Sequence, residues 1–309
     1  MTVPTVAPPA LSREPGRFEK HLVGLVVKSV FFRNRRGGPW PGPEELAHDA
    51  IEFRGNSGAR LVGLHVRVPR PQGIVVLAHP DRRYGKHWFT RDGWLEWLAS
   101  HGFESLTFDF APYGASRGGS TYLHDDLLAA CQEAQRLRPN LPLHVIGLSL
   151  GAFATANASP HLDGVESMVL ESPYPTFASW YDHSAQAGAL PTVNKALERV
   201  LPRTYRRIDA GANIRNARPT RILVAAAAHD PVTPAALTRQ VAAQAPPQTV
   251  RYLELPRHDH LGLFHEPAYR AAILETLLGA PVQATAGQAP AALAQTLPKA
   301  RRTARPVPA

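Results

Sequence analysis

A serine stands between two glycines in the segment Gly147-Leu148-Ser149-Leu150-Gly151. The apolar run LHVIGL leads into this segment, and the small residues AFATANA follow it. The pattern is typical of a tight strand–turn–helix whose serine sits in a strained turn, while the glycines let strand and helix pass closely. It predicts that Ser149 is a nucleophile. The alternative is an ordinary serine in a glycine-rich turn.

A serine hydroxyl is a poor nucleophile unless a base takes its proton, and the base must itself be oriented by an acid. Asp230 follows the apolar run RILVAAAAH, and His260 ends the five-residue loop PRHDH after the run TVRYLEL. The chain order serine, acid, histidine is the order that accompanies this kind of serine turn. We therefore predict Asp230 as the orienting acid and His260 as the base.

Each of these assignments has an alternative. Glu171 ends the run VESMVLE and is a second candidate for the acid, and His258 is a second candidate for the base. The segment His258-Asp259-His260 could also be read as metal ligands, but no further ligand obviously groups with it, so we predict no metal site. Asp109 also ends an expected strand, and we interpret it as structural, anchoring the loop that follows.

Acyl chemistry also needs donors for the negative charge that develops on the carbonyl oxygen. The backbone N–H of Leu150, directly after the nucleophile, is one candidate. The second is expected in the loop after the run GIVVLAH, at residues 73–79. Since Pro80 has no N–H, we predict that the backbone N–H of Asp81 is the second donor.

Alternating strand-like and helix-like segments lead to these residues. The apolar run at 73–79, bounded by turn residues, predicts a buried parallel strand. Further strands are expected at 104–110, 143–148, 165–172, 221–230 and 249–255. Helices are expected between them, and Gly55-Asn56-Ser57-Gly58 predicts a turn between two further strands. Such alternation indicates a doubly wound, mostly parallel sheet, in which ligands bind at the carboxyl ends of the strands. We predict that residues 37–280 form this domain, with a short helical cap insertion at about 173–218.

Several stretches together resemble a known family, namely LAHP, FDFAPYGASRGGS, VIGLSLGA, VLESPY, AAAHDPVTP and LPRHDHLGL. Over about residues 48–279 the chain resembles the α/β-hydrolase superfamily, and it is most similar to small serine hydrolases of the prolyl oligopeptidase and serine aminopeptidase branches. The resemblance implies the α/β-hydrolase fold and the same three residues, Ser149, Asp230 and His260. The chain departs from the family's pattern at His79-Pro80, which replaces His-Gly, and at Ala111-Pro112, which replaces Arg-Gly.

A serine nucleophile favours esters, thioesters and amides as substrates. We expect a carboxylic ester hydrolase acting on a small-molecule acyl substrate. The alternatives are a peptidase or an acyltransferase on the same residues, or an inactive hydrolase-fold binding protein, which Pro80 would favour. No dinucleotide fingerprint is present, since Gly114, Gly118 and Gly119 lack the G-x-G-x-x-G strand–helix setting, and no cofactor is expected.

The net charge of +9 is concentrated at the two ends of the chain. Residues 1–36 hold 7 Lys/Arg and 2 Asp/Glu, residues 281–309 hold 4 Lys/Arg and no acid, and 37–280 are neutral. We expect no specific nucleic-acid surface on a neutral body. The basic N-terminal extension 1–36 is expected to be partly disordered and partly helical, and 281–309 a disordered tail; weak contact of these ends with a membrane surface is an alternative. The oligomeric state stays open.

A single cysteine and the lack of an apolar leader in the first twenty residues favour a cytoplasmic location.

Overall fold

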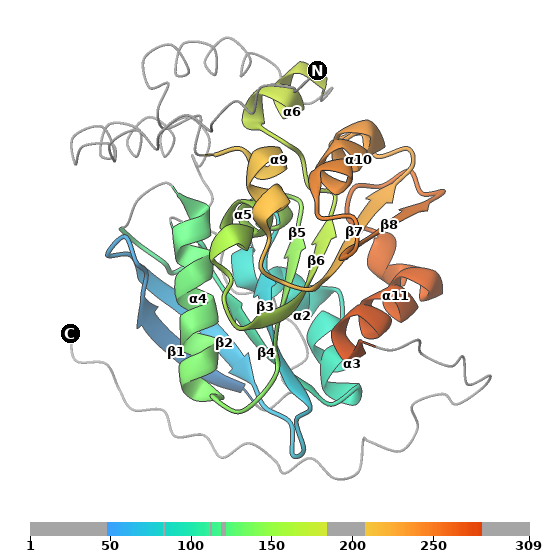
Figure 1. Ribbon diagram of the computed structural model, residues 1–309. Coiled ribbons are helices and arrows are strands. Elements are labelled where there is room, and N and C mark those ends of the chain that lie inside the picture. Colours follow the sequence, from blue (N-terminus) through green and yellow to red (C-terminus); the bar gives the residue numbers. More distant parts are fainter. Residues whose placement is uncertain (1–47, 83, 112, 119–121, 184–207, 280–309) are drawn as a thin grey trace, which may run out of the picture.

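The computed structural model describes residues 48–82, 84–111, 113–118, 122–183 and 208–279. Within these residues eight strands form one sheet, in the order β1-β2-β4-β3-β5-β6-β7-β8 (Figure 1). Strand β2 is antiparallel to both of its neighbours, whereas all pairs from β4 to β8 are parallel. The strands are β1 (His48–Arg54), β2 (Arg60–Val66), β3 (Gly73–Ala78), β4 (Phe103–Phe108), β5 (Leu143–Leu148), β6 (Val165–Glu171), β7 (Arg221–Ala227) and β8 (Val250–Leu255).

Helices cover both faces of the sheet (Figure 1). The α-helices are α2 (Trp88–Arg91), α3 (Trp94–Ser100), α4 (Leu123–Leu137), α5 (Leu150–Ala158), α6 (Phe177–His183), α9 (Ala210–Asn213), α10 (Ala235–Gln244) and α11 (Pro267–Leu278). Short 3₁₀ helices are η1 (Gly85–His87), η2 (Ser159–His161), η3 (Ile214–Asn216) and η4 (Leu263–His265). This layered arrangement is the doubly wound α/β fold that the alternation of segments predicts.

The hydrophobic core has two halves because side chains alternate along each strand. On β3, Ile74 and Val76 face α4, α5 and α10, whereas Val75 and Leu77 face α2, α3 and α11. Every residue of β3, β4 and β5 is buried. Burial on both faces explains why β3 and β5 are nearly continuous apolar runs rather than alternating patterns, whereas β4 also buries Glu104, Ser105 and Thr107.

The element boundaries agree with the sequence prediction in most places. Gly58 donates its N–H to the carbonyl of Gly55 at 2.9 Å, which closes the expected turn between β1 and β2. The expected strand at 104–110 instead ends at Phe108, although the N–H of Asp109 still bonds to the carbonyl of Val62 on β2.

The predicted cap insertion is only partly within the described residues. Its first part contains α6, and its last part contains α9 and η3. Residues 184–207 of this insertion lie outside the described residues, as do the basic extension 1–36 and the tail 281–309. Within the described ranges, no helix is long and apolar enough to cross a membrane.

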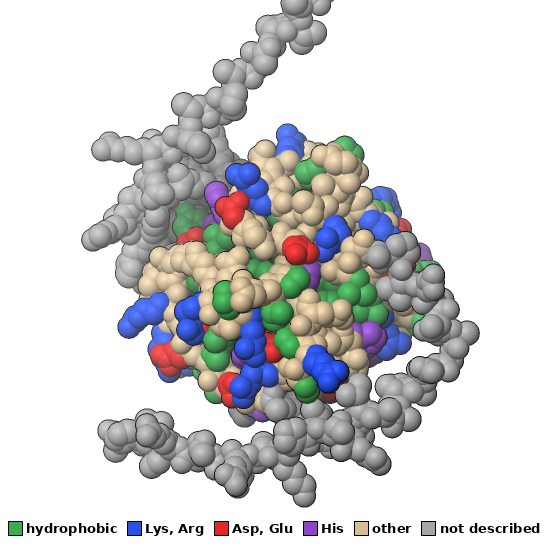
Figure 2. All heavy atoms as spheres, turned by 60° about the horizontal axis from the view of Figure 1, so that its bottom comes forward, with side chains coloured by type: hydrophobic (Ala, Val, Ile, Leu, Met, Phe, Trp, Pro, Cys, Tyr) green, Lys and Arg blue, Asp and Glu red, His purple; other side chains and the backbone are tan. Residues whose placement is uncertain are grey.

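Charges of opposite sign are interspersed on the described surface. Figure 2 shows blue and red side chains next to one another on the face it displays, with hydrophobic side chains between them. Ion pairs on the described surface include Arg60–Glu52, Arg221–Glu166 and Arg239–Glu254.

Candidate active site

Ser149 occupies a strained turn between β5 and α5. Its backbone has φ 52° and ψ −110°, a conformation that costs free energy in a residue with a Cβ. A Cβ on Gly151 would lie 2.0 Å from the carbonyl oxygen of Ala78, and one on Gly147 would lie 2.6 Å from that of Gly151. Both positions therefore need glycine, because the start of α5 presses directly against β3 and β5.

The side chains of Ser149, His260 and Asp230 form one hydrogen-bonded chain. The distance from Ser149 Oγ to His260 Nε2 is 2.7 Å, and the distance from His260 Nδ1 to Asp230 Oδ2 is also 2.7 Å. A carboxylate only accepts hydrogen bonds, so Nδ1 carries the ring proton and Nε2 is left to accept the serine proton. All three side chains are buried, each with less than a tenth of its residue surface exposed.

Strand ends bring these three residues together. Ser149 follows β5, Asp230 lies three residues beyond the end of β7, and His260 lies five beyond the end of β8. Because β5 to β8 are parallel neighbours, their carboxyl ends meet at one edge of the sheet. Residues 111 and 30 positions apart in sequence thus become hydrogen-bond partners.

The carboxylate of Asp230 is held by four donors. Its Oδ1 accepts the N–H groups of Val232 and Thr233 at 2.8 and 2.9 Å. Its Oδ2 accepts His260 Nδ1 and, at 3.1 Å, the hydroxyl of Ser172. These contacts fix the plane of the carboxylate relative to the imidazole.

The structure places the alternative acid and base elsewhere. His260 Nδ1 bonds to Asp230, whereas the Glu171 side chain lies in the interior near Tyr269 of α11. Burial raises the pKa of Glu171 to about 8. The exposed ring of His258 stacks on His229, with centroids 4.3 Å apart.

The metal-ligand alternative also finds no support in the described part of the chain. Arg257 pairs with the Asp259 carboxylate at 2.8 Å and, through its other terminal nitrogen, with Glu266 at 2.9 Å. No group of three or more His, Cys, Asp or Glu side chains among the described residues is arranged to hold a metal ion.

Both predicted oxyanion donors lie just beyond the ends of adjacent strands. Ala78 of β3 pairs with Gly147 of β5 in the sheet. Asp81 and Leu150 each follow by three residues, on the same edge. Leu150 is the first residue of α5, so its N–H has no acceptor within the helix. The positions of these two amides are compatible with the predicted role, which stays a prediction.

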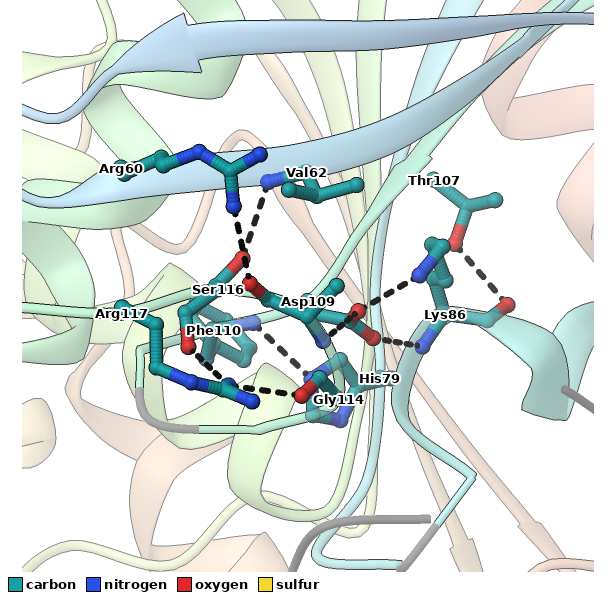
Figure 3. Close-up of polar contacts among 11 residues, drawn as sticks. Arg60, Val62, His79, Lys86, Thr107, Asp109, Phe110, Gly114, Ser116 and Arg117 are labelled. Carbon is teal, nitrogen blue, oxygen red and sulfur yellow. Dashed lines mark hydrogen bonds and ion pairs between the residues drawn. The ribbon is translucent and has the colours of Figure 1, made fainter. Parts of the chain in front are cut away.

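A buried ion pair anchors the loop that contains Asp81. The Asp109 carboxylate accepts the backbone N–H and the Nζ of Lys86 at 2.9 and 2.6 Å (Figure 3). It also accepts the N–H of Ala115 at 3.0 Å. Burial would raise the pKa of Asp109, but the charge and hydrogen bonds of Lys86 outweigh that effect and hold it below its usual value. Asp109 therefore anchors the loop after β3, through Lys86, as well as the loop after β4, through Ala115.

Two further contacts connect the same loops, one between His79 and Phe110 and one between Tyr113 and Asp81. His79 Nε2 accepts the N–H of Phe110 at 3.1 Å, and Nδ1 bonds to the carbonyl of Pro80 at 2.8 Å (Figure 3 shows the first of these). This pattern requires the neutral ring protonated at Nδ1, and complete burial lowers the pKa of His79 accordingly. The hydroxyl of Tyr113 donates to Asp81 Oδ1 at 2.5 Å.

Sequence reasoning did not identify Ser172 or Lys86 as part of this arrangement. Ser172 follows β6 directly, so the rule that functional residues gather at strand ends could have found it. Lys86 has no such signal, because a lysine in a loop is ordinarily exposed.

Comparisons with known proteins agree with the fold. A family model described as serine aminopeptidase, S33, matches residues 69–221. A search of curated proteins finds no significant match. The chain is similar in structure to an esterase from Pyrococcus furiosus, with a TM-score of 0.62 and 14% identity over 80% of this chain and 98% of that one.

Two further solved structures are similar at the same level of identity. Acetyl xylan esterase 1 from Thermoanaerobacterium sp. has a TM-score of 0.59 and 14% identity, over 78% of this chain and 86% of that one. An acylaminoacyl peptidase from Pyrococcus horikoshii has a TM-score of 0.56 and 14% identity, over 79% of this chain and 40% of that one. With the eight-stranded sheet and the matched family model, these findings show the α/β-hydrolase fold.

Proposed function

We propose that the protein is a serine hydrolase that cleaves a carboxylic ester or thioester of a small molecule through an acyl-enzyme on Ser149. The observation that carries this proposal is the hydrogen-bonded chain from Ser149 through His260 to Asp230. It combines a nucleophile in a strained turn, a base at 2.7 Å and an acid that orients the base.

The geometry supports the following reaction. Ser149 Oγ attacks the carbonyl carbon of the substrate while His260 Nε2 takes the hydroxyl proton. The Asp230 carboxylate stabilises the imidazolium that forms, and the N–H groups of Leu150 and Asp81 donate to the oxyanion. The imidazolium then gives its proton to the leaving alcohol or thiol as the carbon–oxygen or carbon–sulfur bond breaks. Water, deprotonated by His260, attacks the acyl-enzyme and releases the carboxylic acid.

A peptidase acting through the same residues is the second candidate. It is favoured by the match to a model described as serine aminopeptidase and by the structural similarity to an acylaminoacyl peptidase. The chemistry differs only in the leaving group, which is an amine rather than an alcohol or thiol. The described residues do not distinguish the two, because part of the predicted cap lies outside them.

A substrate panel tests the proposal and separates the two candidates. We expect the purified protein to hydrolyse 4-nitrophenyl esters of short and medium acyl chains and acyl thioesters faster than aminoacyl and N-acyl-aminoacyl anilides. Ser149→Ala should abolish all hydrolysis, while Ser159→Ala should retain it, since the Ser159 hydroxyl bonds only to the carbonyl of Ala156 at the far end of α5. Faster anilide cleavage would favour the peptidase, and hydrolysis that survives in Ser149→Ala would contradict both.

A further inference from the structure

Two strained residues lie side by side in the hydrogen-bond network of this site. Among the described residues, Ser149 and Ser172 are the only ones other than glycine with a positive φ, at 52° and 53°. A residue with a Cβ stays in this region only where its surroundings enforce it, and such strain gathers at functional sites. Ser149 has a role in the proposed reaction, whereas Ser172 has none so far.

The side chain of Ser172 contacts Asp230, the predicted acid, rather than core side chains. Its N–H bonds to the carbonyl of Ala225 at 2.9 Å, which ties the end of β6 to β7. Its hydroxyl donates to Asp230 Oδ2 at 3.1 Å, and the residue is 1% exposed. The preceding carbonyl, that of Glu171, accepts the N–H of Ser149 at 2.8 Å. The turn at the end of β6 therefore contacts both the nucleophile's backbone and the acid's side chain.

The hydroxyl of Ser172 shares an acceptor with the base. Oδ2 of Asp230 accepts both Ser172 and His260 Nδ1, while Oδ1 is occupied by two backbone N–H groups. Without Ser172, Oδ2 would be held only by the imidazole it has to orient. The hydroxyl also withdraws part of the negative charge that the carboxylate offers to the imidazolium.

We propose that Ser172 is a positioning residue that holds the Asp230 carboxylate in line with His260, and that its strained backbone is maintained to aim this hydroxyl. The inference rests on the proposed function, because it assigns Asp230 and His260 their roles in that reaction. A purely structural serine would leave both the turnover and the protonation of the base unchanged when its hydroxyl is removed.

Two variants separate the hydroxyl from the backbone strain. Ser172→Ala removes the hydroxyl and keeps a Cβ at positive φ, whereas Ser172→Gly removes the hydroxyl and relieves the strain. We expect both to lower kcat for a 4-nitrophenyl ester about tenfold with KM changed less than twofold, as for the loss of one oriented hydrogen bond. Ser172→Gly should have the higher Tm. The matched control Ser159→Ala, which also removes a buried hydroxyl, should keep the wild-type kcat.

The pH profile gives a readout that a structural role would not move. Because the carboxylate in both variants offers more of its charge to the imidazolium, the low-pH limb of kcat/KM should move up by about half a pH unit. Wild-type kcat and an unmoved limb in both variants would overturn the proposal. So would a loss of activity confined to Ser172→Ala, since that result would trace the effect to strain.

A spectroscopic measurement keeps this test separate from the proposed function. The His260 Nδ1 proton, bonded to a carboxylate, is expected at low field in the ¹H NMR spectrum of the intact protein, and it should move further downfield in Ser172→Ala and Ser172→Gly but not in Ser159→Ala. If the wild-type protein hydrolyses no ester or amide, the proposed function fails. The resonance still decides whether Ser172 acts on the acid–base pair: a shift supports it, and an unchanged resonance overturns it.

Discussion

At the scale of single residues, close backbone contact at the serine turn decides whether the site can form. A Cβ on Gly151 would lie only 2.0 Å from the carbonyl oxygen of Ala78. No side-chain rotation relieves this contact, because the position of a Cβ is set by the backbone and the atom it meets is a backbone oxygen. The geometry of the turn therefore depends on backbone packing between β3 and α5, which requires glycine at position 151.

Gly151→Ala should strongly destabilise the protein and remove its activity. We expect a loss of at least several kcal/mol in the free energy of unfolding, measured by urea denaturation, because strand β3 and helix α5 must separate. Gly93→Ala is the matched control. Its φ of +76° strains an alanine, but nothing lies within 4 Å of the new Cβ, so the cost should be about 1 kcal/mol. Equal effects of the two substitutions would contradict a governing role for the contact with Ala78, because Gly151, unlike Gly93, has no positive φ.

The residues of the candidate site differ in how well they can be predicted from the sequence. Ser149, Asp230 and His260 are found because each follows a strand and their chain order matches one known mechanism. Ser172 also follows a strand, but its place in the chain order matches no role in that mechanism, and a lysine in a loop such as Lys86 is ordinarily exposed. Their roles depend on which oxygen a side chain reaches in space, and spacing along the chain does not encode that.

At the scale of elements, the Lys86–Asp109 pair joins the loop after β3 to the loop after β4. The Asp109 side chain is fully buried and that of Lys86 is 8% exposed. Breaking such a pair leaves an uncompensated charge in the interior. The same loop contains Asp81, so we expect its position to depend on this pair.

Lys86→Met should lower the free energy of unfolding by about 3–5 kcal/mol, measured by chemical denaturation. Adding Asp109→Asn should recover part of the loss, since the stranded charge is then removed. Arg136→Met, which breaks a surface pair with Glu133 on α4, should change the free energy of unfolding far less, because solvent screens the charge of Arg136. A loss of similar size in Lys86→Met and Arg136→Met would contradict an anchoring role for the buried pair.

The elements themselves were largely predictable. Buried parallel strands such as β3 and β5 are recognised as apolar runs because both of their faces are covered. The ends of the strands were less predictable. Strand β4 stops at Phe108, and the next residue, Asp109, directs its side chain to Lys86 and Ala115, which the sequence pattern does not reveal. Residues 184–207 of the predicted cap insertion lie outside the described residues, so the helical structure expected there stays a prediction.

At the scale of the whole molecule, the sheet places a buried carboxyl group directly beside the site. Glu171 ends β6, and its pKa of about 8 results first from burial. In the unfolded chain the pKa of this group is near 4.5. Between these values the folded state keeps a proton that the unfolded state releases, so raising the pH favours unfolding.

Glu171→Gln should therefore become increasingly stabilising relative to wild type as the pH rises. We expect the difference in free energy of unfolding to grow by up to about 1.4 kcal/mol per pH unit between pH 5 and 8, and to level off above pH 8. Denaturant titrations at pH 5, 6.5 and 8 measure it. A difference that does not vary with pH would show that Glu171 titrates alike in the folded and unfolded states.

The charge distribution and the neighbouring structures describe the molecule at the same scale. Residues 37–280 carry no net charge, and the excess of +9 belongs to ends that lie outside the described residues. Weak membrane contact of these ends and a cytoplasmic location stay predictions. The similarity to two esterases and a peptidase shows the fold, while the reaction rests on the site.

The most direct test of the account is to treat the protein with a fluorophosphonate probe and to map the modified residue by mass spectrometry. We predict a single label on Ser149, formed much more slowly in Asp230→Asn and His260→Ala and at the wild-type rate in Ser159→Ala. No label on a folded wild-type protein, or a label on another residue, would contradict the assignment of Ser149 as an activated nucleophile. A label on Ser149 at an unchanged rate in Asp230→Asn and His260→Ala would contradict the roles of acid and base.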